Sequence, residues 1–438
     1  MRAMKDSGVE WIDRIPADWE VQNLKSFFSF GKGLPITKEN LRESGVPVIS
    51  YGQIHGKYNP GTRLINELFR YVDAEYLTSN PSALVHQGDF IFADTSEDVD
   101  GCGNCCYVDK EIQLFAGYHT VVLSAANRQD NSYLAYLFRT DAWRSQIRRE
   151  LVEVKVYSIS RKVLRKTTIL LPPPAEQQRI AAYLDEQCGE IDKVLAKTRE
   201  SIEEYKKLKQ SVITEAVTKG IRPDRPMKDS GIEWIGDIPA EWRKEKIFRL
   251  FCNIGSGTTP KSSDESAYCG EVNWIQSGDI NGSVLTATNK SVSNRALEEY
   301  SALKVYTAPF IVMAMYGASI GNLAISQINA CVNQACCVLS SSTADFKFLF
   351  YNLMAVKPYL IHKGVGGGQS NISQDIIKQL WLPLPPDAEQ QQIVAYLDQQ
   401  CAEIDNQITK KEQIITELES YKKSLIYECV TGKREVAG

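Results

Sequence analysis

Few residues in this chain have the types and spacing that catalysis requires. The pentapeptide Gly317-Ala-Ser-Ile-Gly321 matches the GxSxG pattern of a nucleophilic serine. A nucleophile elbow needs a helix directly after the serine, whereas the residues that follow favour a strand, so a tight turn is the simpler interpretation. The sequence contains no phosphate loop of the GxxxxGKS/T type, no HExxH and no Asn/Asp-Pro-Pro-aromatic tetrapeptide. We therefore predict no catalytic residues.

The cysteines offer one candidate metal cluster. Cys102, Cys105 and Cys106 include a CxxC pair, but no second pair lies at zinc-ligand spacing. The chain has eleven cysteines, an odd number, and they are scattered in mostly apolar surroundings such as residues 335–339. This distribution favours reduced, buried thiols over a disulfide framework. We expect no metal and no cofactor in this chain.

A basic stretch could contact nucleic acid. Residues 139–166 contain nine Arg or Lys opposed by three acidic residues, in a chain with a net charge of −4. A local excess of about six positive charges suits a phosphate-contacting face, although a solvated helix face is the alternative. The nine are Arg139, Arg144, Arg148, Arg149, Lys155, Arg161, Lys162, Arg165 and Lys166.

A glycine-rich segment in the second half is the other candidate. Gly364-Val-Gly-Gly-Gly368 precedes Gln369, Ser370 and Asn371. Glycine lets the backbone approach a phosphate closely, and Gln or Asn can form two hydrogen bonds with adenine. A flexible surface loop is the alternative.

Two segments of the sequence occur twice. Residues 4–19, MKDSGVEWIDRIPADW, return as residues 227–242, MKDSGIEWIGDIPAEW, with four differences. Residues 175–192, AEQQRIAAYLDEQCGEID, return as residues 388–405, AEQQQIVAYLDQQCAEID, also with four. The 155 and 145 residues between these segments diverge. The pattern indicates one scaffold that presents two different recognition surfaces.

Each copy of the second segment opens a long heptad helix. Apolar or near-apolar residues fit alternating steps of four and three from Ile191 to Ala216 and from Ile404 to Cys429. Two slots of each seam are polar instead: Thr198 and Lys209 in the first helix, Lys411 and Lys422 in the second. Each helix would span about 44 residues, or roughly 65 Å. Pairing the two helices with each other would cover their apolar stripes.

An antiparallel pair would bring the C-terminus beside the N-terminus, and joining VTGKREVAG to MRAMKDSG nearly rebuilds the internal VTKGIRPDRPMKDSG. The predicted fold is mixed α/β: two α/β blocks separated by two long antiparallel coiled-coil helices, pseudo-twofold and circularly organised. We place the boundaries at residues 1–174 for block one, 175–222 for the central helix, 223–387 for block two and 388–438 for the C-terminal helix.

Weak correspondences link the two blocks. VISYGQI (residues 48–54) aligns with WIQSGDI (residues 274–280), and Gly31-Lys-Gly33 aligns with Gly255-Ser-Gly257. VYSISRKVLRK (residues 156–166) aligns with QSNISQDIIKQ (residues 369–379). The blocks are therefore expected to share a fold and to differ in what they contact. No segment is apolar enough to cross a membrane and the N-terminus has no apolar signal core, so a cytoplasmic protein is expected.

These features resemble the specificity subunits of type I restriction-modification systems. The resemblance covers the whole chain and rests on GVEWIDRIPADW and GIEWIGDIPAEW, on LPPPAEQQRIAAYLDEQ and LPLPPDAEQQQIVAYLDQQ, and on QSNIS. It implies that each block is a target recognition domain for one half of a bipartite double-stranded DNA site. It also implies that the helices bind two methyltransferase subunits, that restriction/translocase subunits join outside, and that S-adenosylmethionine and ATP bind to those partners.

Within this resemblance we expect DNA contacts from twelve residues. They are Tyr51, Gln53, Lys155, Tyr157, Arg161 and Lys162 in block one, and Thr258, Gln276, Ser277, Gln369, Ser370 and Asn371 in block two. Two alternatives remain open at this point: a stand-alone bipartite DNA-binding repressor, and a scaffold whose blocks bind proteins.

Overall fold

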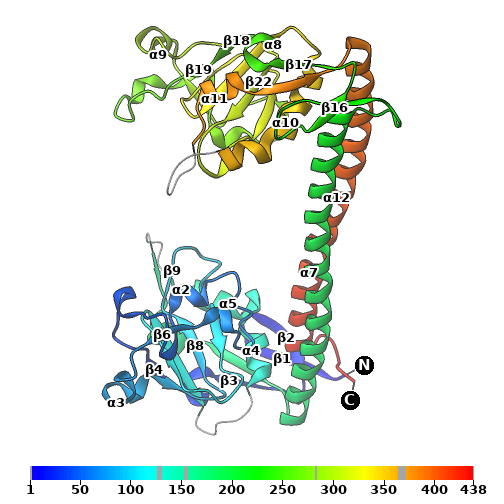
Figure 1. Ribbon diagram of the computed structural model, residues 1–438. Coiled ribbons are helices and arrows are strands. Elements are labelled where there is room, and N and C mark those ends of the chain that lie inside the picture. The colour runs from blue at the N-terminus through cyan, green and yellow to red at the C-terminus, as the bar shows by residue number, and fades with distance from the viewer. Residues whose placement is uncertain (1, 126–130, 152–155, 282–283, 364–370, 438) are drawn as a thin grey trace. The chain divides into compact units, whose positions relative to one another are not determined.

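The computed structural model divides into two compact units (Figure 1). It describes residues 2–125, 131–151, 156–281, 284–363 and 371–437. Unit 1 comprises Met1–Thr198 with Gln413–Gly438, and unit 2 comprises Arg199–Glu412. The two long helices, α7 (Pro174–Lys219) and α12 (Asp387–Val430), each contribute one end to each unit. Mixed α/β units and a long helical pair confirm the predicted fold class.

Unit 1 contains two four-stranded sheets. The first has the order β10-β8-β12-β4 and the second β6-β5-β11-β7. Their strands are β4 (Phe28–Lys32), β8 (Phe90–Ala93), β10 (Cys105–Tyr107), β12 (Thr120–Ala125), β5 (Val46–Ile49), β6 (Arg70–Val72), β7 (Leu84–Val85) and β11 (Leu114–Ala116). Two-stranded ladders pair β1 (Met4–Val9) with β2 (Ile12–Pro16), β3 (Glu20–Asn23) with β14 (Thr168–Leu171), and β9 (Thr95–Ser96) with β13 (Tyr157–Ser158). The short helices are α1 (Leu24–Phe27), α2 (Tyr51–Ile54), α3 (Tyr76–Ser79), α4 (Ser132–Leu137), α5 (Asp141–Arg148) and α6 (Arg161–Leu164).

Unit 2 repeats this plan with a five-stranded and a three-stranded sheet. Their orders are β18-β25-β22-β23-β20 and β21-β19-β24. The strands are β18 (Phe251–Gly255), β19 (Tyr268–Ile275), β20 (Val284–Leu285), β21 (Lys290–Val292), β22 (Phe310–Ala314), β23 (Leu323–Ser326), β24 (Ala330–Val332) and β25 (Cys336–Ser342). The ladders pair β15 (Met227–Asp229) with β16 (Asp237–Pro239) and β17 (Arg243–Lys246) with β26 (Trp381–Leu384). The helices are α8 (Ile247–Leu250), α9 (Asn294–Glu299), α10 (Phe346–Lys363) and α11 (Gln374–Gln379).

The long helices are antiparallel within each unit. In unit 1 the start of α7, including Leu184 and Ile191, shares a buried core with Leu425 and Cys429 at the end of α12. In unit 2 the end of α7 shares a core with the start of α12 instead. Apolar side chains at every third or fourth position bury much of one face of each helix in these cores, which stabilises the pair. The predicted helix pairing is confirmed.

Polar residues in the helix seam are matched by ion pairs. Lys422 Nζ lies 2.6 Å from Asp192 Oδ1 in unit 1, and Lys209 Nζ lies 2.7 Å from Asp405 Oδ2 in unit 2. The two pairs occupy equivalent positions of the sequence repeat. A charged residue in an apolar seam tolerates only the register that provides its partner, so these pairs specify the alignment of the helices.

The tryptophan-containing repeats dock each block onto its helices. Trp19 is fully buried, and its Nε1 donates to Glu176 on the first turn of α7 at 3.2 Å; Trp242 donates to Glu389 on α12 at 3.0 Å. Each carboxylate also accepts from a guanidinium, that of Arg2 in unit 1 and that of Arg225 in unit 2.

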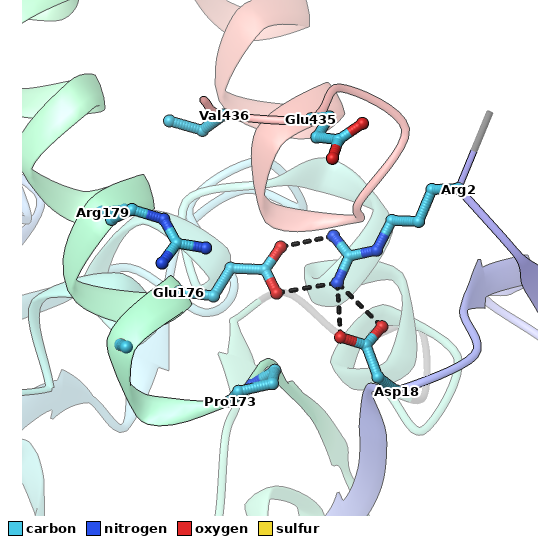
Figure 2. A pocket seen from close by; sticks show the side chains of 8 residues that line it. Arg2, Asp18, Pro173, Glu176, Arg179, Glu435 and Val436 are labelled. Atoms are coloured by element: carbon cyan, nitrogen blue, oxygen red, sulfur yellow. Dashed lines mark hydrogen bonds and ion pairs between the residues drawn. The ribbon is translucent and has the colours of Figure 1, made fainter. Parts of the chain in front are cut away.

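Figure 2 shows the unit 1 arrangement, in which Arg2 bridges Glu176 and Asp18 beside the C-terminal residues Glu435 and Val436. Chain ends therefore make in unit 1 the contacts that the internal junction makes in unit 2, which confirms the circular organisation.

Candidate nucleic-acid interface

A short loop in unit 1, residues 117–119, joins the ends of several strands; we call it the unit 1 junction loop. Gly117 N donates to Ile49 O at 2.7 Å, and Asp94 N donates to His119 O at 3.1 Å. A Cβ at Gly33 would lie 1.9 Å from Gly117 O, so only glycine allows β4 to pass this close. The loop thereby gathers the ends of β4, β5 and β8 at one edge of the unit.

Tyr51 lies at this edge. Its backbone N donates to Tyr118 O at 3.3 Å, and its ring packs edge-on against His55, Tyr118 and His119, with centroids 5.4–6.3 Å apart. Such aromatic contacts hold a ring in one orientation. Gln53, in contrast, uses its side-chain oxygen to accept from Ser50 N at 3.2 Å, which caps α2. Tyr51 is thus half-buried and fixed by its aromatic neighbours, and the side-chain oxygen of Gln53 is already used in capping α2.

The segment with Tyr157 reaches the same edge. Tyr157 is opposite Ser96 in the β13–β9 ladder, and Ile159 N donates to Asp94 O at 2.7 Å. His55 Nε2 lies 2.8 Å from Thr95 O, which connects this ladder to α2 and Tyr51. Ser160 then caps α6, on which Arg161 and Lys162 are exposed. Of the six unit 1 candidates, Lys155 lies outside the described residues.

Unit 2 has the same backbone network around residues 333–335, the unit 2 junction loop. Asn333 N donates to Ile275 O at 3.0 Å and Met315 N donates to Ala335 O at 2.8 Å. Ile372 N donates to Met315 O at 3.0 Å, as Ile159 does to Asp94. A Cβ at Gly257 would lie 1.7 Å from Val332 O, as at Gly33. The aligned segments of the two blocks thus occupy equivalent places.

The described unit 2 candidates surround this loop. Thr258 follows Gly257 and is half-buried. Gln276 and Ser277 begin the short helix Ser277–Asp279, which Asp279 caps by accepting from Gln276 N at 2.8 Å. Asn371 is exposed and bridges to Tyr316. Gln369 and Ser370 lie outside the described residues.

Three exposed or half-exposed side chains of the junction loops were not singled out from the sequence. His119 is 59 % exposed, with Nδ1 3.3 Å from Asp94 Oδ1, and Tyr118 lies beside it. Gln334 of unit 2 is exposed and its Oε1 accepts from Thr259 Oγ1 at 2.6 Å. In the sequence these residues are distinguished only by their position between two strand-like runs, downstream of the aligned glycines Gly33 and Gly257.

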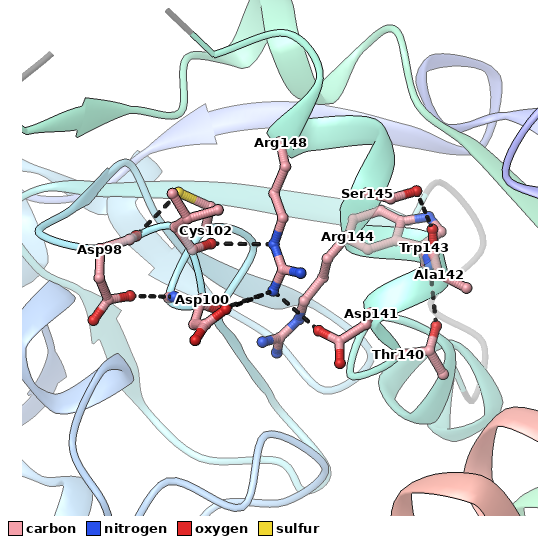
Figure 3. Close-up of polar contacts among 12 residues, drawn as sticks. Asp98, Asp100, Cys102, Thr140, Asp141, Ala142, Trp143, Arg144, Ser145 and Arg148 are labelled. Atoms are coloured by element: carbon pink, nitrogen blue, oxygen red, sulfur yellow. Dashed lines mark hydrogen bonds and ion pairs between the residues drawn. The ribbon is translucent and has the colours of Figure 1, made fainter. Parts of the chain in front are cut away.

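The basic stretch of unit 1 is not one continuous phosphate-contacting face. Arg144 is half-buried; its Nε donates to Phe138 O at 2.9 Å, and desolvation lowers its pKa to about 10. Arg148 pairs with Asp141 at 3.0 Å and donates to the carbonyls of Val99 and Asp100 (Figure 3). Arg149 and Lys166 pair with Glu10 and Glu150. The exposed cations of this stretch that form no ion pair among the described residues are Arg139, which donates to Pro60 O, and Arg161, Lys162 and Arg165 on α6 and its flank. Arg165 lies over the Phe30 ring at 5.1 Å.

The cysteines do not form a metal site among the described residues, where no cluster of three ligand-type side chains occurs. Cys102, Cys105 and Cys106 are buried. Burial raises the pKa of Cys105 to about 12, which keeps the free thiol protonated. In unit 2, burial raises the pKa of Cys336 and Cys337 to about 12 each, whereas Cys252 on β18 is exposed.

The GxSxG match forms a turn rather than a nucleophile elbow. Residues Gly317–Ser319 make a single 3-10 turn with Gly317 at a φ of 65°, and β23 follows. This agrees with the tight turn favoured by the sequence. In the described part of the chain, no helix is long and apolar enough to span a membrane.

Two units with one backbone plan and different exposed side chains define a class of protein with two recognition modules on a common helical frame. Comparison with known proteins gives the family. The chain belongs to the type I restriction modification DNA specificity domain family, whose model matches residues 16–204 and 241–420. It is a specificity subunit of a type I restriction-modification system, and the resemblance seen in the sequence is confirmed.

Relatives align along nearly the whole chain. A protein of Methanocaldococcus jannaschii named "Putative type I restriction enzyme MjaX specificity subunit" is 26 % identical, over 97 % of this chain and 96 % of its own length. The type I restriction enzyme MjaVIII specificity subunit of the same organism is 24 % identical, over 97 % and 94 %. A chain from a structural study of complex assembly and conformational transition of the type I R-M system superposes with a TM-score of 0.69 at 19 % identity, covering 96 % of this chain and 99 % of that one. This last likeness supports the fold.

Proposed function

We propose that each unit reads one half of a bipartite double-stranded DNA site through its junction loop and the segments around it. The observation that carries this proposal is the repeated backbone network, in which Gly33 and Gly257, Asp94 and Met315 take equivalent places. The side chains displayed on that network differ between the units. Since base edges are read by side chains, a constant backbone with variable side chains suits two different half-sites.

We propose base or backbone contacts from the described candidates of each unit. In unit 1 they are Tyr51, Gln53, Tyr157, Arg161 and Lys162, with Lys155 added from the sequence. In unit 2 they are Thr258, Gln276, Ser277 and Asn371, with Gln369 and Ser370 added from the sequence. We retain the boundaries 1–174, 175–222, 223–387 and 388–438 as the limits of two recognition domains and two spacer helices.

We also infer the division of labour within the complex. The chain is a non-catalytic subunit, and α7 and α12 bind two methyltransferase subunits, with restriction/translocase subunits outside. Leu208 in unit 2 and Tyr421 in unit 1 support this, because they are 48 % and 49 % exposed at equivalent positions of the repeat. Exposed apolar side chains on a helix favour a helical partner. S-adenosylmethionine and ATP would bind to the partner subunits, and the complex would act in the cytoplasm on DNA.

A domain exchange tests the proposal. Replacing residues 20–174 by the corresponding block of a related specificity subunit should change one half of the methylated sequence and leave the other intact, because the frame and unit 2 are unchanged. Replacing residues 243–387 is the matched control and should change the opposite half. Sequencing of methylated bases in cells provides the measurement, and a change in both halves, or in neither, would contradict modular recognition.

DNA-binding measurements on the same proteins distinguish the proposed specificity subunit from the two alternatives, a stand-alone repressor and a protein-binding scaffold. A stand-alone repressor would bind its site without the methyltransferase subunit, and a protein-binding scaffold would show no salt-dependent DNA binding. Family membership favours the specificity subunit over both.

A further inference from the structure

A cluster of cations and aromatic rings lies on β17 and α8 of unit 2. Residues 243–249 hold four cations and one carboxylate, a local excess of three positive charges. We call the surface the β17–α8 patch and define it by Arg243, Lys244, Lys246, Phe248, Arg249 and Trp381. Glu245, the one acidic residue in the stretch, pairs with Arg249 at 3.1 Å.

Aromatic rings hold these cations at the surface. Lys244 Nζ and Lys246 Nζ lie 5.4 Å and 5.2 Å from the ring of Trp381, which is opposite Lys246 in the β17–β26 ladder. Phe248 is 43 % exposed, and Lys246 and Arg249 lie over its ring at 6.0 Å and 5.5 Å. Cation–π contacts of this kind fix long side chains without neutralising their charge.

The lysine charges are not compensated locally. Lys244 Nζ donates to Ser230 O and Lys246 Nζ donates to Gln379 Oε1, both of which are neutral acceptors. Among the described residues, no carboxylate forms an ion pair with Arg243, Lys244 or Lys246. Lys244 and Lys246 share one face of β17 beside Trp381, so two uncompensated charges lie together there and suit an anionic ligand.

Unit 1 has no such cluster on the matching elements. Its β3 pairs with β14 as β17 pairs with β26, but Asn23 and Thr168 stand where unit 2 has Lys246 and Trp381. Unit 1 carries exposed cations instead on α6, at Arg161 and Lys162.

Within each unit, the elements that correspond to these two basic surfaces lie next to each other. In unit 1, Leu24 N at the start of α1 donates to Thr167 O just after α6, at 2.9 Å. In unit 2, Ile247 N at the start of α8 donates to Leu380 O just after α11, at 3.0 Å. Because α6 and α11 both follow a capping serine at aligned positions, each unit presents positive charge in the same neighbourhood but from a different element.

We propose that the β17–α8 patch binds the sugar-phosphate backbone of DNA beside the half-site of unit 2 and positions the duplex without reading its sequence. This inference rests on the proposed function of unit 2. Duplex DNA is favoured as the occupant because it presents regularly spaced phosphates to uncompensated cations, and because unit 1 keeps charge in the equivalent place.

The test uses the complex of the full chain with its methyltransferase subunits and two duplexes: one bearing the site found by methylation sequencing, the other with that site scrambled. The triple variant Lys244→Gln, Lys246→Gln, Arg249→Gln should bind both duplexes about 10- to 100-fold more weakly at low salt. The slope of log K against log salt should fall by roughly two to three, since each lost phosphate contact removes about 0.9. The methylated sequence should stay the same.

A charge-retaining variant, Lys244→Arg, Lys246→Arg, Arg249→Lys, is the matched control and should keep the salt slope of the parent. An unchanged slope in the triple variant, a changed methylated sequence, or loss of methyltransferase subunits from the complex would each overturn the inference; the last result would indicate an acidic protein partner. Failure of the parent complex to bind either duplex would instead count against the proposed function. Melting temperatures that match between the parent and the variants exclude misfolding as the cause of a change in binding.

Discussion

The junction loops of the two units differ in side chains and agree in backbone. Unit 1 displays Tyr118 and His119, and the equivalent positions of unit 2 are Gln334 and Ala335. In both units the backbone hydrogen bonds of the loop join the same strands. Backbone groups exist at every residue, so these bonds place no demand on side-chain identity. The difference teaches that the fold can hold this edge in place while the side chains on it change.

Each unit docks onto a long helix through a buried carboxylate, Glu176 in unit 1 and Glu389 in unit 2, and removing either should destabilise its unit to a similar extent. Glu389→Ala removes the acceptor of the Trp242 indole and one of the two carboxylate partners of Arg225, whose side chain is 9 % exposed and which keeps Glu241. Losing both contacts should cost about 2–3 kcal/mol. Glu176→Ala should cost a similar amount in unit 1, where Arg2 keeps Asp18. Calorimetric unfolding, with hydrogen exchange to locate the loss, is the measurement.

The exposed Glu186 on α7 provides the control, since its replacement by Ala should change stability by less than about 0.5 kcal/mol. A large loss from Glu389→Ala with none from Glu176→Ala would show that the two frames are not equivalent.

Exchanging the junction-loop side chains sharpens the comparison. The double variant Tyr118→Gln, His119→Ala gives unit 1 the side chains of unit 2 and should weaken recognition of its half-site by about 1–3 kcal/mol for each lost base contact. The other half-site should be unaffected. Sequencing of methylated bases gives the readout, and Gln334→Ala, which should alter only the opposite half, is its counterpart. Unaltered methylation in both variants would place base reading elsewhere on the units.

The pH dependence of the free energy of unfolding should show a smaller effect, which depends on Glu389. Burial opposes ionisation of this group, but hydrogen bonds from Arg225 and Trp242 outweigh it and hold its pKa below the usual 4.5. A carboxyl whose pKa is lower in the folded state contributes stability above its unfolded pKa and loses that contribution as the pH falls through the folded value. Unfolding of the parent should therefore become easier below about pH 4.5. Glu389→Gln should flatten this part of the profile; an identical slope in both proteins would rule out the assignment.

The smallest effect is expected at the seam. Lys209 and Lys422 are 24 % and 23 % exposed, and their Asp partners about half exposed. Screened ion pairs of this kind contribute about 0.5 kcal/mol, so Lys209→Ala and Lys422→Ala should each lower stability slightly, equally, and less at high salt. Unequal losses in thermal unfolding would show that one end of the helical pair depends more on its register than the other.

Heptad periodicity was sufficient to predict the helical pair, and the similarity between the joined chain ends and the internal junction predicted its circular organisation. Heptad spacing is local information, and the four-and-three alternation before Ala216 and Cys429 needs no knowledge of the blocks. The alignment of VISYGQI with WIQSGDI also placed Tyr51 and Ser277 correctly at the ends of matching strands. When a sequence is repeated, the structural position of a residue in one copy therefore predicts the position of its counterpart in the other.

Long-range partners could not be predicted in the same way. Arg149 pairs with Glu10, and half-buried Arg144 lies against Gly103; neither fact is visible in the spacing of residues 139–166. Counting charges therefore overstated the phosphate-contacting surface of unit 1. His119 was not predicted as a candidate because its exposure depends on the turn between β11 and β12, which belong to different sheets. This turn gives His119 a φ of 55°, which is uncommon for a residue other than glycine.

The burial of the thiols has a practical consequence for labelling. Among the ten cysteines whose side chains the structure describes, Cys252 alone is exposed, on the strand that leads toward Thr258. Alkylation requires an accessible thiolate, which burial denies to the other nine. Among these ten, Cys252 is therefore the thiol that a maleimide fluorophore should label under native conditions, which would place an optical reporter of ligand binding on unit 2.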